Sequence, residues 1–357
     1  MPTLIKRPCS KGRGATSNPA GRFETARTEA IDDGWSEQES ELPPLRTSVT
    51  AEPARSIITR NRSPDVPFEL SINPYRGCEH GCVYCFARPG HAYLNLSPGL
   101  DFETKLFFKA DAARLLEGQL AQPGYRCSPI TLGANTDPYQ PIERRLGVTR
   151  SVLEVLKRYK HPVSIITKGA LIERDLDLLE EMGRRGLASV IVSVTTLDND
   201  LKRRLEPRAA APVARLKTLR RLSAAGIPTG TLLAPVIPGI NDQEIERILE
   251  ACAKAGAETA GYVFIRLPYE VKTLFREWLD EHMPLKADHI MSLIRQSRGG
   301  KEYDSCFSQR MRGTGPFAEL VRKRFGAACA RYGLNLGERP ALDTSQFAVP
   351  GAQMQLF

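Results

Sequence analysis

Three cysteines lie close together in the stretch NPYRGCEHGCVYCFARPGH at residues 73–91. They are Cys78, Cys82 and Cys85, separated by three and then by two residues. Thiolates at this spacing can converge on one metal centre from a short loop, and Gly77 and Gly81 permit the sharp turns that such a loop requires. The spacing therefore predicts a metal site with three cysteine ligands and no fourth cysteine.

Two kinds of metal site remain open at this point. A structural zinc ion is bound by four protein ligands and has no open coordination position, and His80 or His91 could supply the fourth ligand. The protein would then be a zinc-stapled nucleic-acid-binding module without catalysis. A cubane [4Fe-4S] cluster held by three cysteines instead leaves one iron open, and that iron can chelate the amino and carboxylate groups of a bound molecule. We favour the cluster, because it explains the missing fourth ligand.

Short apolar or β-branched runs alternate with amphipathic segments after residue 100, which predicts repeated strand-helix units. The runs are PITLGA (129–134), VSIITK (163–168), SVIVSV (189–194), GTLLAP (230–235) and GYVFIR (261–266). Units of this length imply parallel strands covered by helices. With one more strand before the cysteines, in PFELSINPYRG, the pattern predicts the α/β class and a partial (β/α)6 TIM-like barrel.

In such barrels the chemistry lies at the carboxyl ends of the strands, so the polar residues there are candidate site residues. They are Asn135, Thr136, Asp137, Lys168, Ser193 and Thr195. Glu206 and Arg208 follow the fourth of the six strands and could also reach the site, although a surface ion pair between them is an equal alternative.

The cysteine spacing, an aromatic residue immediately before the last cysteine (Tyr84) and the partial barrel together resemble the radical S-adenosylmethionine superfamily, over about residues 68–270. The resemblance implies a [4Fe-4S] cluster on the three cysteines and S-adenosylmethionine as cofactor. The reduced cluster would donate one electron that cleaves S-adenosylmethionine into methionine and a 5'-deoxyadenosyl radical. It also implies an electron donor such as flavodoxin or ferredoxin.

The resemblance further implies roles for individual residues. Tyr84 resembles the residue that lies against adenine, and we predict it as a cofactor-binding and catalytic residue. Asn135, Thr136 and Asp137 occupy the strand end that meets the methionyl amino group. Lys168 resembles a cation near the methionyl carboxylate, and Ser193 a contact to that carboxylate or to the ribose. Arg208 is included as a further cofactor-binding candidate.

Within the superfamily, three segments resemble the group around spore photoproduct lyase, the DNA repair photolyase-like proteins. They are TDPYQPIE (136–143), LEPRAAAP (205–212) and APVIPGIND (234–242). Two departures argue for another reaction or substrate. The position of that lyase's hydrogen-donating cysteine is Ala134 here, and its second tyrosine after the last cluster cysteine is Phe86. Cys127 lies at the other end of the same strand, roughly 20 Å away if extended, and should be structural.

The chain divides into four predicted parts. Residues 1–62 are rich in Gly, Pro, Ser, Thr and charge without a sustained period, which predicts a disordered basic and polar arm. Residues 63–270 form the barrel. Residues 271–336 are predicted as a helical extension, and residues 337–357 as a flexible tail. The N-terminus lacks an apolar signal region and no apolar run approaches a membrane span, so we expect a cytoplasmic protein with no membrane partner.

The formal net charge of +9 favours encounter with polyanions, which makes nucleic acid a candidate partner. Part of the charge gathers around FSQRMRGTGPFAELVRKRFGAACARYG, which contains Arg310, Arg312, Arg322, Lys323, Arg324 and Arg331. The RGTG segment there could offer backbone amides to an anion, and a solvated helix face is the alternative. A small molecule or a protein remains an alternative substrate for the same radical chemistry.

The last five residues, QMQLF, follow the pattern Gln, aliphatic, any residue, Leu, Phe. This pattern resembles the peptide by which bacterial DNA polymerases and repair proteins bind the sliding clamp. Gln353, Met354, Leu356 and Phe357 would make that contact. A C-terminus that folds back onto the barrel is the alternative.

Overall fold

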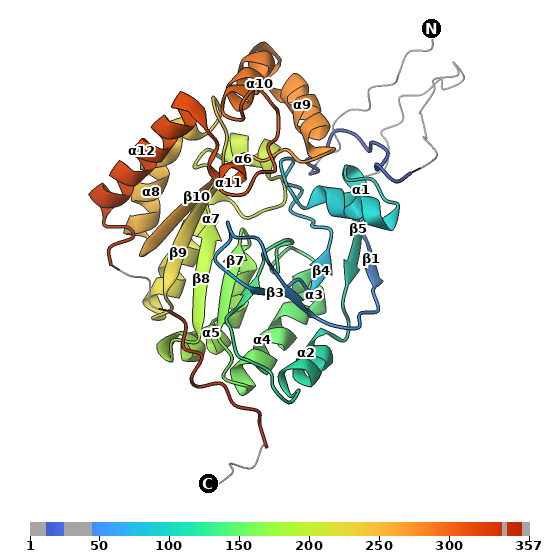
Figure 1. Cartoon of the computed structure of the whole chain (residues 1–357), viewed down its shortest axis with the longest axis vertical. Coiled ribbons are helices and arrows are strands. Elements are labelled where there is room, and N and C mark those ends of the chain that lie inside the picture. Colours follow the sequence, from blue (N-terminus) through green and yellow to red (C-terminus); the bar gives the residue numbers. More distant parts are fainter. Residues whose placement is uncertain (1–11, 25–44, 338–340, 352–357) are drawn as a thin grey trace.

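The protein is described by a computed structural model that covers residues 12–24, 45–337 and 341–351, and a seven-stranded sheet forms its centre (Figure 1). The strand order is β10-β9-β8-β7-β6-β3-β2. Every neighbouring pair is parallel except β2 with β3 at one edge, where β2 runs antiparallel. The strands are β2 (Ile58–Arg60), β3 (Leu70–Ile72), β6 (Ile130–Leu132), β7 (Val163–Thr167), β8 (Ala188–Ser193), β9 (Thr229–Val236) and β10 (Thr259–Phe264). The predicted partial barrel of six parallel strands is confirmed.

Helices follow the strands and cover the outside of the sheet (Figure 1). They are α2 (Ala112–Leu120), α3 (Glu143–Leu146), α4 (Val148–Arg158), α5 (Leu176–Arg184), α6 (Asn199–Leu205), α7 (Pro212–Ala224) and α8 (Ile245–Lys254), with short 3-10 turns η2 (Ala170–Asp175) and η3 (Asp242–Glu244). The apolar three-to-four spacing of each long helix is what buries it. In α4, for example, Val152, Leu153 and Leu156 have no exposed surface.

A second, three-stranded sheet carries the cysteine loop. It consists of β1 (Ser48–Ala51), β5 (Lys105–Phe108) and β4 (Tyr75–Arg76), with β5 in the middle. The loop leaves β4 and leads into η1 (Arg88–Leu94), and α1 (Leu100–Thr104) returns the chain to β5. Because β4 follows β3 directly, the loop begins at the carboxyl end of a barrel strand.

Helices also fill the region after β10. They are α9 (Val271–His282), η4 (Pro284–Lys286), α10 (Ala287–Gln296), α11 (Gln309–Arg312) and α12 (Gly315–Tyr332). The long helix α12 lies beside α8 (Figure 1), and Arg324 of α12 binds the Glu246 carboxylate of α8 at 2.7 and 2.8 Å. No helix in the described ranges has the length and apolar character needed to cross a bilayer.

Two parts of the predicted N-terminal arm are ordered, so the prediction of disorder does not hold for them. Residues 45–62 contain β1 and β2, each paired to a barrel or cysteine-loop strand. In residues 12–24, the Arg13 guanidinium donates to the carbonyl oxygens of Glu103 and Leu45 at 2.9 and 2.7 Å. These partners lie far along the chain, which is why no local pattern revealed them. Residues 1–11 and 25–44 lie outside the described part.

The predicted flexible tail is likewise ordered over residues 341–351. Phe347 packs against the rings of Tyr125, Tyr159 and His161, with centroids 5.4, 6.4 and 5.5 Å away. Gln346 accepts hydrogen bonds from the Arg185 guanidinium at 2.9 and 3.1 Å. This segment therefore folds back onto the barrel. The four residues predicted to contact a sliding clamp lie outside the described part, and that contact stays a prediction.

Candidate cluster and cofactor site

The cysteine loop is held by backbone contacts to several parts of the fold. Cys78 N donates to Phe102 O at 2.9 Å, and Val83 N donates to Leu205 O, beyond β8, at 3.1 Å. Cys78 and Cys82 are buried, and Cys85 is partly buried. A loop fixed from both sides can hold its three thiols in one arrangement before any metal binds.

Two glycines allow the chain to make this loop. Gly77 and Gly81 have φ angles of +76° and +67°, in the left-handed region that favours glycine. A Cβ at Gly77 would lie 2.7 Å from Leu106, and a Cβ at Gly81 would lie 2.8 Å from the Glu103 carboxylate. The turns inferred from the sequence are therefore present, and neither position has room for a side chain.

The donor set fits a cluster better than a single zinc ion. Zinc ligands lie about 2.1–2.3 Å from the metal and so crowd together, and no three His, Cys, Asp or Glu residues in the described ranges are arranged in that way. His80 Nδ1 lies 3.3 Å from Asp137 and His91 Nε2 lies 2.9 Å from Lys105 O; because each contact uses one ring nitrogen only, these contacts do not distinguish the two metals. The thiolates of a cluster bind different irons and need not meet at one point.

Burial raises the pKa of all three thiols, to about 12 at Cys82. The neighbouring Asp137 and the two other thiols add to this effect at Cys78. The thiols are therefore protonated at neutral pH in the metal-free protein, and metal binding must displace these protons.

A buried arginine is hydrogen-bonded to the backbone of the cysteine loop. Arg88 donates from Nε to Cys82 O at 2.9 Å and from Nη1 to the carbonyl oxygens of Pro98 and Gly99 at 3.0 and 2.9 Å. Its Nη2 is paired with the carboxylate of Glu103, and both side chains have no exposed surface. The same carboxylate accepts hydrogen bonds from Gly14 N and Ala15 N, each at 2.9 Å. Sequence reasoning missed this pair, because neither residue belongs to a motif.

The strand-end residues after β6 divide into two groups. Thr136 is buried and its hydroxyl donates to Tyr75 O at 2.8 Å, whereas Asn135 is exposed and only its backbone N is bound, by Asn73 Oδ1 at 3.1 Å. The Asp137 carboxylate accepts from Thr167 Oγ1 and Lys168 N, both at 2.7 Å. Asp137 therefore ties the end of β6 to the end of β7.

Asp137 is ionised despite its burial. Burial opposes its charge, but the neighbouring His80 and the hydrogen bonds to the carboxylate lower its pKa to about 2. Asp137 thus supplies a fixed negative charge beside the cysteine loop. The structure leaves Asn135 as the one member of this predicted group whose side chain faces solvent.

Lys168 and Ser193, predicted from separate strand ends, lie together. Lys168 Nζ donates to Ser193 Oγ at 2.8 Å and to Ala234 O at 3.2 Å. It also lies 3.9 Å from Glu206 Oε1. The ammonium and the hydroxyl can therefore present a positive charge and a hydrogen-bonding group to one ligand.

Glu206 is the centre of a buried network at these strand ends. Its carboxylate accepts hydrogen bonds from the Tyr84 hydroxyl and from Thr195 Oγ1, the latter at 2.7 Å. It is also paired with the Arg215 guanidinium, which donates to Ser193 O at 2.9 Å. Burial opposes its ionisation, but Arg215, followed by Lys168 and the two hydroxyls, lowers the pKa of Glu206 to about 2.

This network fixes Tyr84 through its hydroxyl. Burial, followed by Cys82 and Glu206, raises the pKa of Tyr84, so the phenol stays protonated and donates to the carboxylate. Its predicted contact to adenine and its catalytic role stay predictions. Arg208 does not pair with Glu206; it lies 3.2 Å from Glu79 of the cysteine loop. Arg215 was missed, because a charged residue in an amphipathic helix indicates a surface position.

The three residues that mark the departures are placed as follows. Ala134 follows β6 at its carboxyl end, and Cys127 precedes the same strand at the opposite end. Phe86 follows the last cysteine with 44% of its surface exposed, and the guanidinium of Arg266 lies 5.0 Å from its ring centroid. Cys127 therefore lies at the end of the strand away from the cysteine loop.

Comparison with known proteins gives one family match. The family described as the radical SAM superfamily matches residues 72–252. An uncharacterized protein of Mycobacterium tuberculosis (strain ATCC 25618 / H37Rv) is 34% identical over 82% of this chain and 83% of its own. An uncharacterized protein of Methanocaldococcus jannaschii is 25% identical over 60% of this chain and 76% of its own.

Among solved structures, spore photoproduct lyase complexed with dinucleoside spore photoproduct has a similar fold. The TM-score is 0.58 at 13% identity, and the match covers 80% of each chain. A mutant of that lyase with bound S-adenosylmethionine and dinucleoside spore photoproduct matches over the same shares, with a TM-score of 0.52.

Proposed function

The chain belongs to the radical SAM superfamily, whose members use a [4Fe-4S] cluster and S-adenosylmethionine, and on this basis we propose that it is a radical enzyme that acts on nucleic acid. When bound, the cluster supplies the electron that cleaves S-adenosylmethionine and generates a 5'-deoxyadenosyl radical. That electron must come from outside the chain, so a donor such as flavodoxin or ferredoxin is part of the proposal.

One observation carries the chemical part of this proposal. The loop with Cys78, Cys82 and Cys85 begins at the carboxyl end of β3, and the network of Lys168, Ser193 and Glu206 lies at the same ends of β7 and β8. Tyr84 connects the loop to the network by donating to Glu206. A thiol-bearing loop and a polar binding surface are thus held in one rigid arrangement.

Each group has a defined task in this arrangement. The three thiols would hold the cluster. Lys168 would attract the methionyl carboxylate, and its own orientation is fixed by Ser193 and Ala234 O. The buried pair of Glu206 and Arg215 would keep Tyr84 in place without adding a net charge of its own.

Two observations favour nucleic acid as the substrate. The net charge of +9 promotes encounter with phosphate backbones. The lyase of similar fold was solved in complex with a dinucleoside spore photoproduct, so this arrangement of strands can accommodate a dinucleoside in at least one enzyme. A small molecule or a protein as substrate would require neither the charge nor this fold relationship.

The reaction we propose differs from spore photoproduct repair. Ala134 has no hydrogen to donate at the strand end where the lyase is expected to have a cysteine, and Phe86 has no phenolic hydrogen to relay. With 44% of its surface exposed, Phe86 presents its ring to an incoming base instead. We therefore propose that hydrogen abstraction from the nucleic acid leads to modification or repair by a route without a protein thiol donor.

Substrate-dependent cleavage of S-adenosylmethionine tests this proposal. The reduced enzyme is incubated with S-adenosylmethionine and, in parallel, with DNA, RNA, a metabolite extract or a protein extract, and 5'-deoxyadenosine is quantified. DNA or RNA should increase 5'-deoxyadenosine above the uncoupled background, with deuterium transferred into it from labelled nucleic acid. An increase with the metabolite or protein fraction alone would refute nucleic acid as the substrate.

A further inference from the structure

Unsatisfied polar groups gather in one region outside the cluster site. In the described part of the chain, five buried side-chain nitrogen or oxygen atoms lack a hydrogen-bond partner. Four of the five belong to the end of β10 and the segment after α10; they are Tyr262 Oη, Arg266 Nε, Ser297 Oγ and Arg298 Nε. Ser297 and Arg298 are 1% and 2% exposed. Because buried donors are nearly always satisfied, such a group needs an acceptor from outside the chain, which is either water or a ligand.

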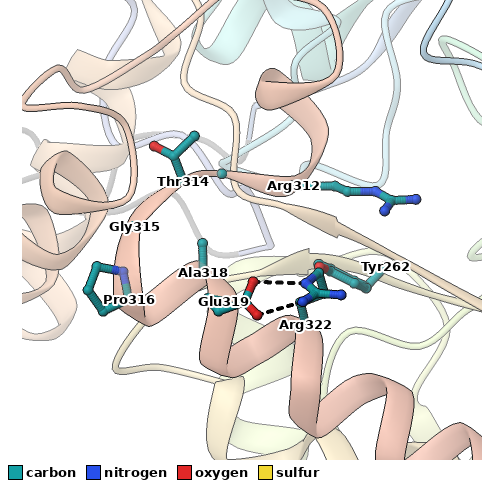
Figure 2. Close-up of a pocket in the computed structure, with 9 residues that line it drawn as sticks. Tyr262, Arg312, Thr314, Gly315, Pro316, Ala318, Glu319 and Arg322 are labelled. Carbon is teal, nitrogen blue, oxygen red and sulfur yellow. Dashed lines mark hydrogen bonds and ion pairs between the residues drawn. The ribbon is translucent and has the colours of Figure 1, made fainter.

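A cavity of about 350 Å³ lies between β10 and the start of α12, and Tyr262 is the one of these four residues that lines it. Its lining residues are Tyr262, Arg312, Gly313, Thr314, Gly315, Pro316, Ala318, Glu319 and Arg322. Ser297 does not line the cavity, but its carbonyl accepts a hydrogen bond from the lining residue Thr314 at 2.9 Å. Figure 2 shows Arg312 on one wall and Arg322 with Tyr262 on the other, all extending in the same direction. The volume falls within the range of small-ligand sites, about 300–1,000 Å³.

Arg312 is the positive charge that this cavity leaves uncompensated. Its basic neighbours are neutralised: Arg310 binds Asp65 at 2.5 Å, Arg322 binds Glu319 at 2.5 and 2.9 Å, and Arg324 binds Glu246. Over the ranges that the structure describes, Arg312 has neither an acidic partner nor a hydrogen bond. Its guanidinium is therefore free to bind an anion that enters the cavity.

The Glu319 carboxylate also lines the cavity and is bound by Arg322, and the remaining polar groups are donors. Burial raises the pKa of Tyr262, so its hydroxyl remains protonated at neutral pH and needs an acceptor. The first turn of α12 has no acidic residue and its Thr314 N-cap makes no side-chain capping bond, so the backbone N–H groups of this turn, other than at Pro316, lack a side-chain cap. An arginine, a phenol and uncapped amides together match the oxygen acceptors of a phosphate group.

We propose that this cavity binds a phosphate of the nucleic-acid backbone and thereby positions the substrate relative to the cluster site. The inference rests on the proposed function for the identity of the phosphate. The positional argument is independent of it: β10 is the last barrel strand, and Arg266, just beyond its end, reaches from this region to Phe86 beside the last cysteine. A nucleic-acid strand whose phosphate is bound at the cavity would thus run toward the exposed ring of Phe86.

Salt-dependent binding of a labelled single-stranded oligonucleotide tests the proposal with the full chain. Each phosphate contact contributes about 0.7 to the slope of log affinity against log salt for single strands. Arg312→Gln should lower the slope by about that amount and weaken binding about fivefold to tenfold at low salt, and Tyr262→Phe should weaken binding without a change in slope. The matched control is Lys323→Gln, which removes the same charge from α12 at a side chain that does not line the cavity.

Equal effects of Arg312→Gln and Lys323→Gln would overturn the proposal, because the contact would then be general electrostatics. A second arm measures thermal unfolding with inorganic phosphate. If phosphate stabilises the wild type through Arg312 while oligonucleotide binding is insensitive to Arg312, the cavity holds a free phosphate or a nucleotide and the backbone assignment is wrong. Cleavage of S-adenosylmethionine without substrate is measured in the same preparations. If the wild type shows no cleavage, the proposed function is refuted. If the wild type cleaves S-adenosylmethionine but Arg312→Gln binds the oligonucleotide as the wild type does, only this inference is refuted.

Discussion

The phenol of Tyr84, one residue before the last cysteine of the loop, donates a hydrogen bond to the buried carboxylate of Glu206, 122 residues further along the chain. Through this bond the cysteine loop is tied to the segment after β8 and, through Glu206, to Arg215 of α7. The orientation of the cysteine loop therefore depends on Glu206 and Arg215, two charged residues that lie far from the cysteines in the sequence.

Substitutions at the two ends of this bond should lower the free energy of unfolding by different amounts. Tyr84→Phe removes one hydrogen bond to a charged group and should lower the free energy of unfolding by about 1.5–3 kcal/mol. Glu206→Ala leaves Arg215 buried without its partner and should cost more, about 3–5 kcal/mol. Urea unfolding measures both, with Glu181→Gln as the control at an exposed pair, where the midpoint should not move. Equal losses in the two variants would contradict the assignment of Glu206 as the centre of the network.

The contact of the N-terminal segment with the cysteine loop gives a second prediction. A Cβ at Gly14 would lie 1.7 Å from Gly81 O, so Gly14→Ala must displace either the segment or the loop. We expect the variant to fold but to retain less iron after anaerobic reconstitution. Gly118→Ala, in α2, has open space around its Cβ and should keep full iron content and be neutral or more stable by about 0.5–1 kcal/mol. Full iron retention in Gly14→Ala would show that the segment does not support the loop.

The buried His161 predicts how stability depends on pH. Burial lowers its pKa to about 4, so the unfolded chain, with a pKa near 6.5, binds the proton more readily than the folded one. The contribution of His161 to the free energy of unfolding is therefore fully present above about pH 6.5. It is lost as the pH falls toward 4, and it amounts to about 3 kcal/mol. Urea unfolding from pH 7 to pH 4.5 should show a steeper decline in the wild type than in His161→Gln. Because His91 shifts in the same direction, the difference between the two curves is what reports His161.

The packing of the C-terminal segment onto the barrel can be tested through Phe347. Its ring contacts Tyr125, Tyr159 and His161 and is partly buried, so Phe347→Ala should lower the unfolding free energy by about 1–3 kcal/mol. Leu336→Ala removes an apolar side chain that is 76% exposed and serves as the control. A midpoint in Phe347→Ala that matches the control would mean that the segment does not pack in solution.

The sequence was sufficient for those features that depend on local patterns. Alternating apolar runs and amphipathic segments predicted six parallel strands, and the cysteine spacing predicted the loop. Strand-end position also brought Lys168 and Ser193 to one place, where their side chains lie 2.8 Å apart. These predictions succeeded because the carboxyl ends of parallel strands meet at one edge of a sheet.

Features that depend on distant partners could not be predicted in this way. Arg88 with Glu103 and Arg215 with Glu206 are buried ion pairs, yet each charge taken alone indicates a solvated position. The order of residues 12–24 arises from amides that bind Glu103, and residues 341–351 are held by Phe347 and Gln346. Neither segment has a periodic pattern, so composition alone indicated disorder for both.

The most direct test of the account is whether the cysteine loop holds a [4Fe-4S] cluster that cleaves S-adenosylmethionine. The protein is reconstituted anaerobically, its iron and sulfide are quantified, its cluster type is assigned by Mössbauer spectroscopy, and 5'-deoxyadenosine is measured after reduction. We expect a brown protein with one [4Fe-4S] cluster. Cys78→Ala, Cys82→Ala and Cys85→Ala should each lose the cluster and the cleavage activity, and Cys127→Ala, whose thiol lies at the far end of β6, should retain both. A colourless protein with stoichiometric zinc, or normal iron content in the three loop variants, would contradict it.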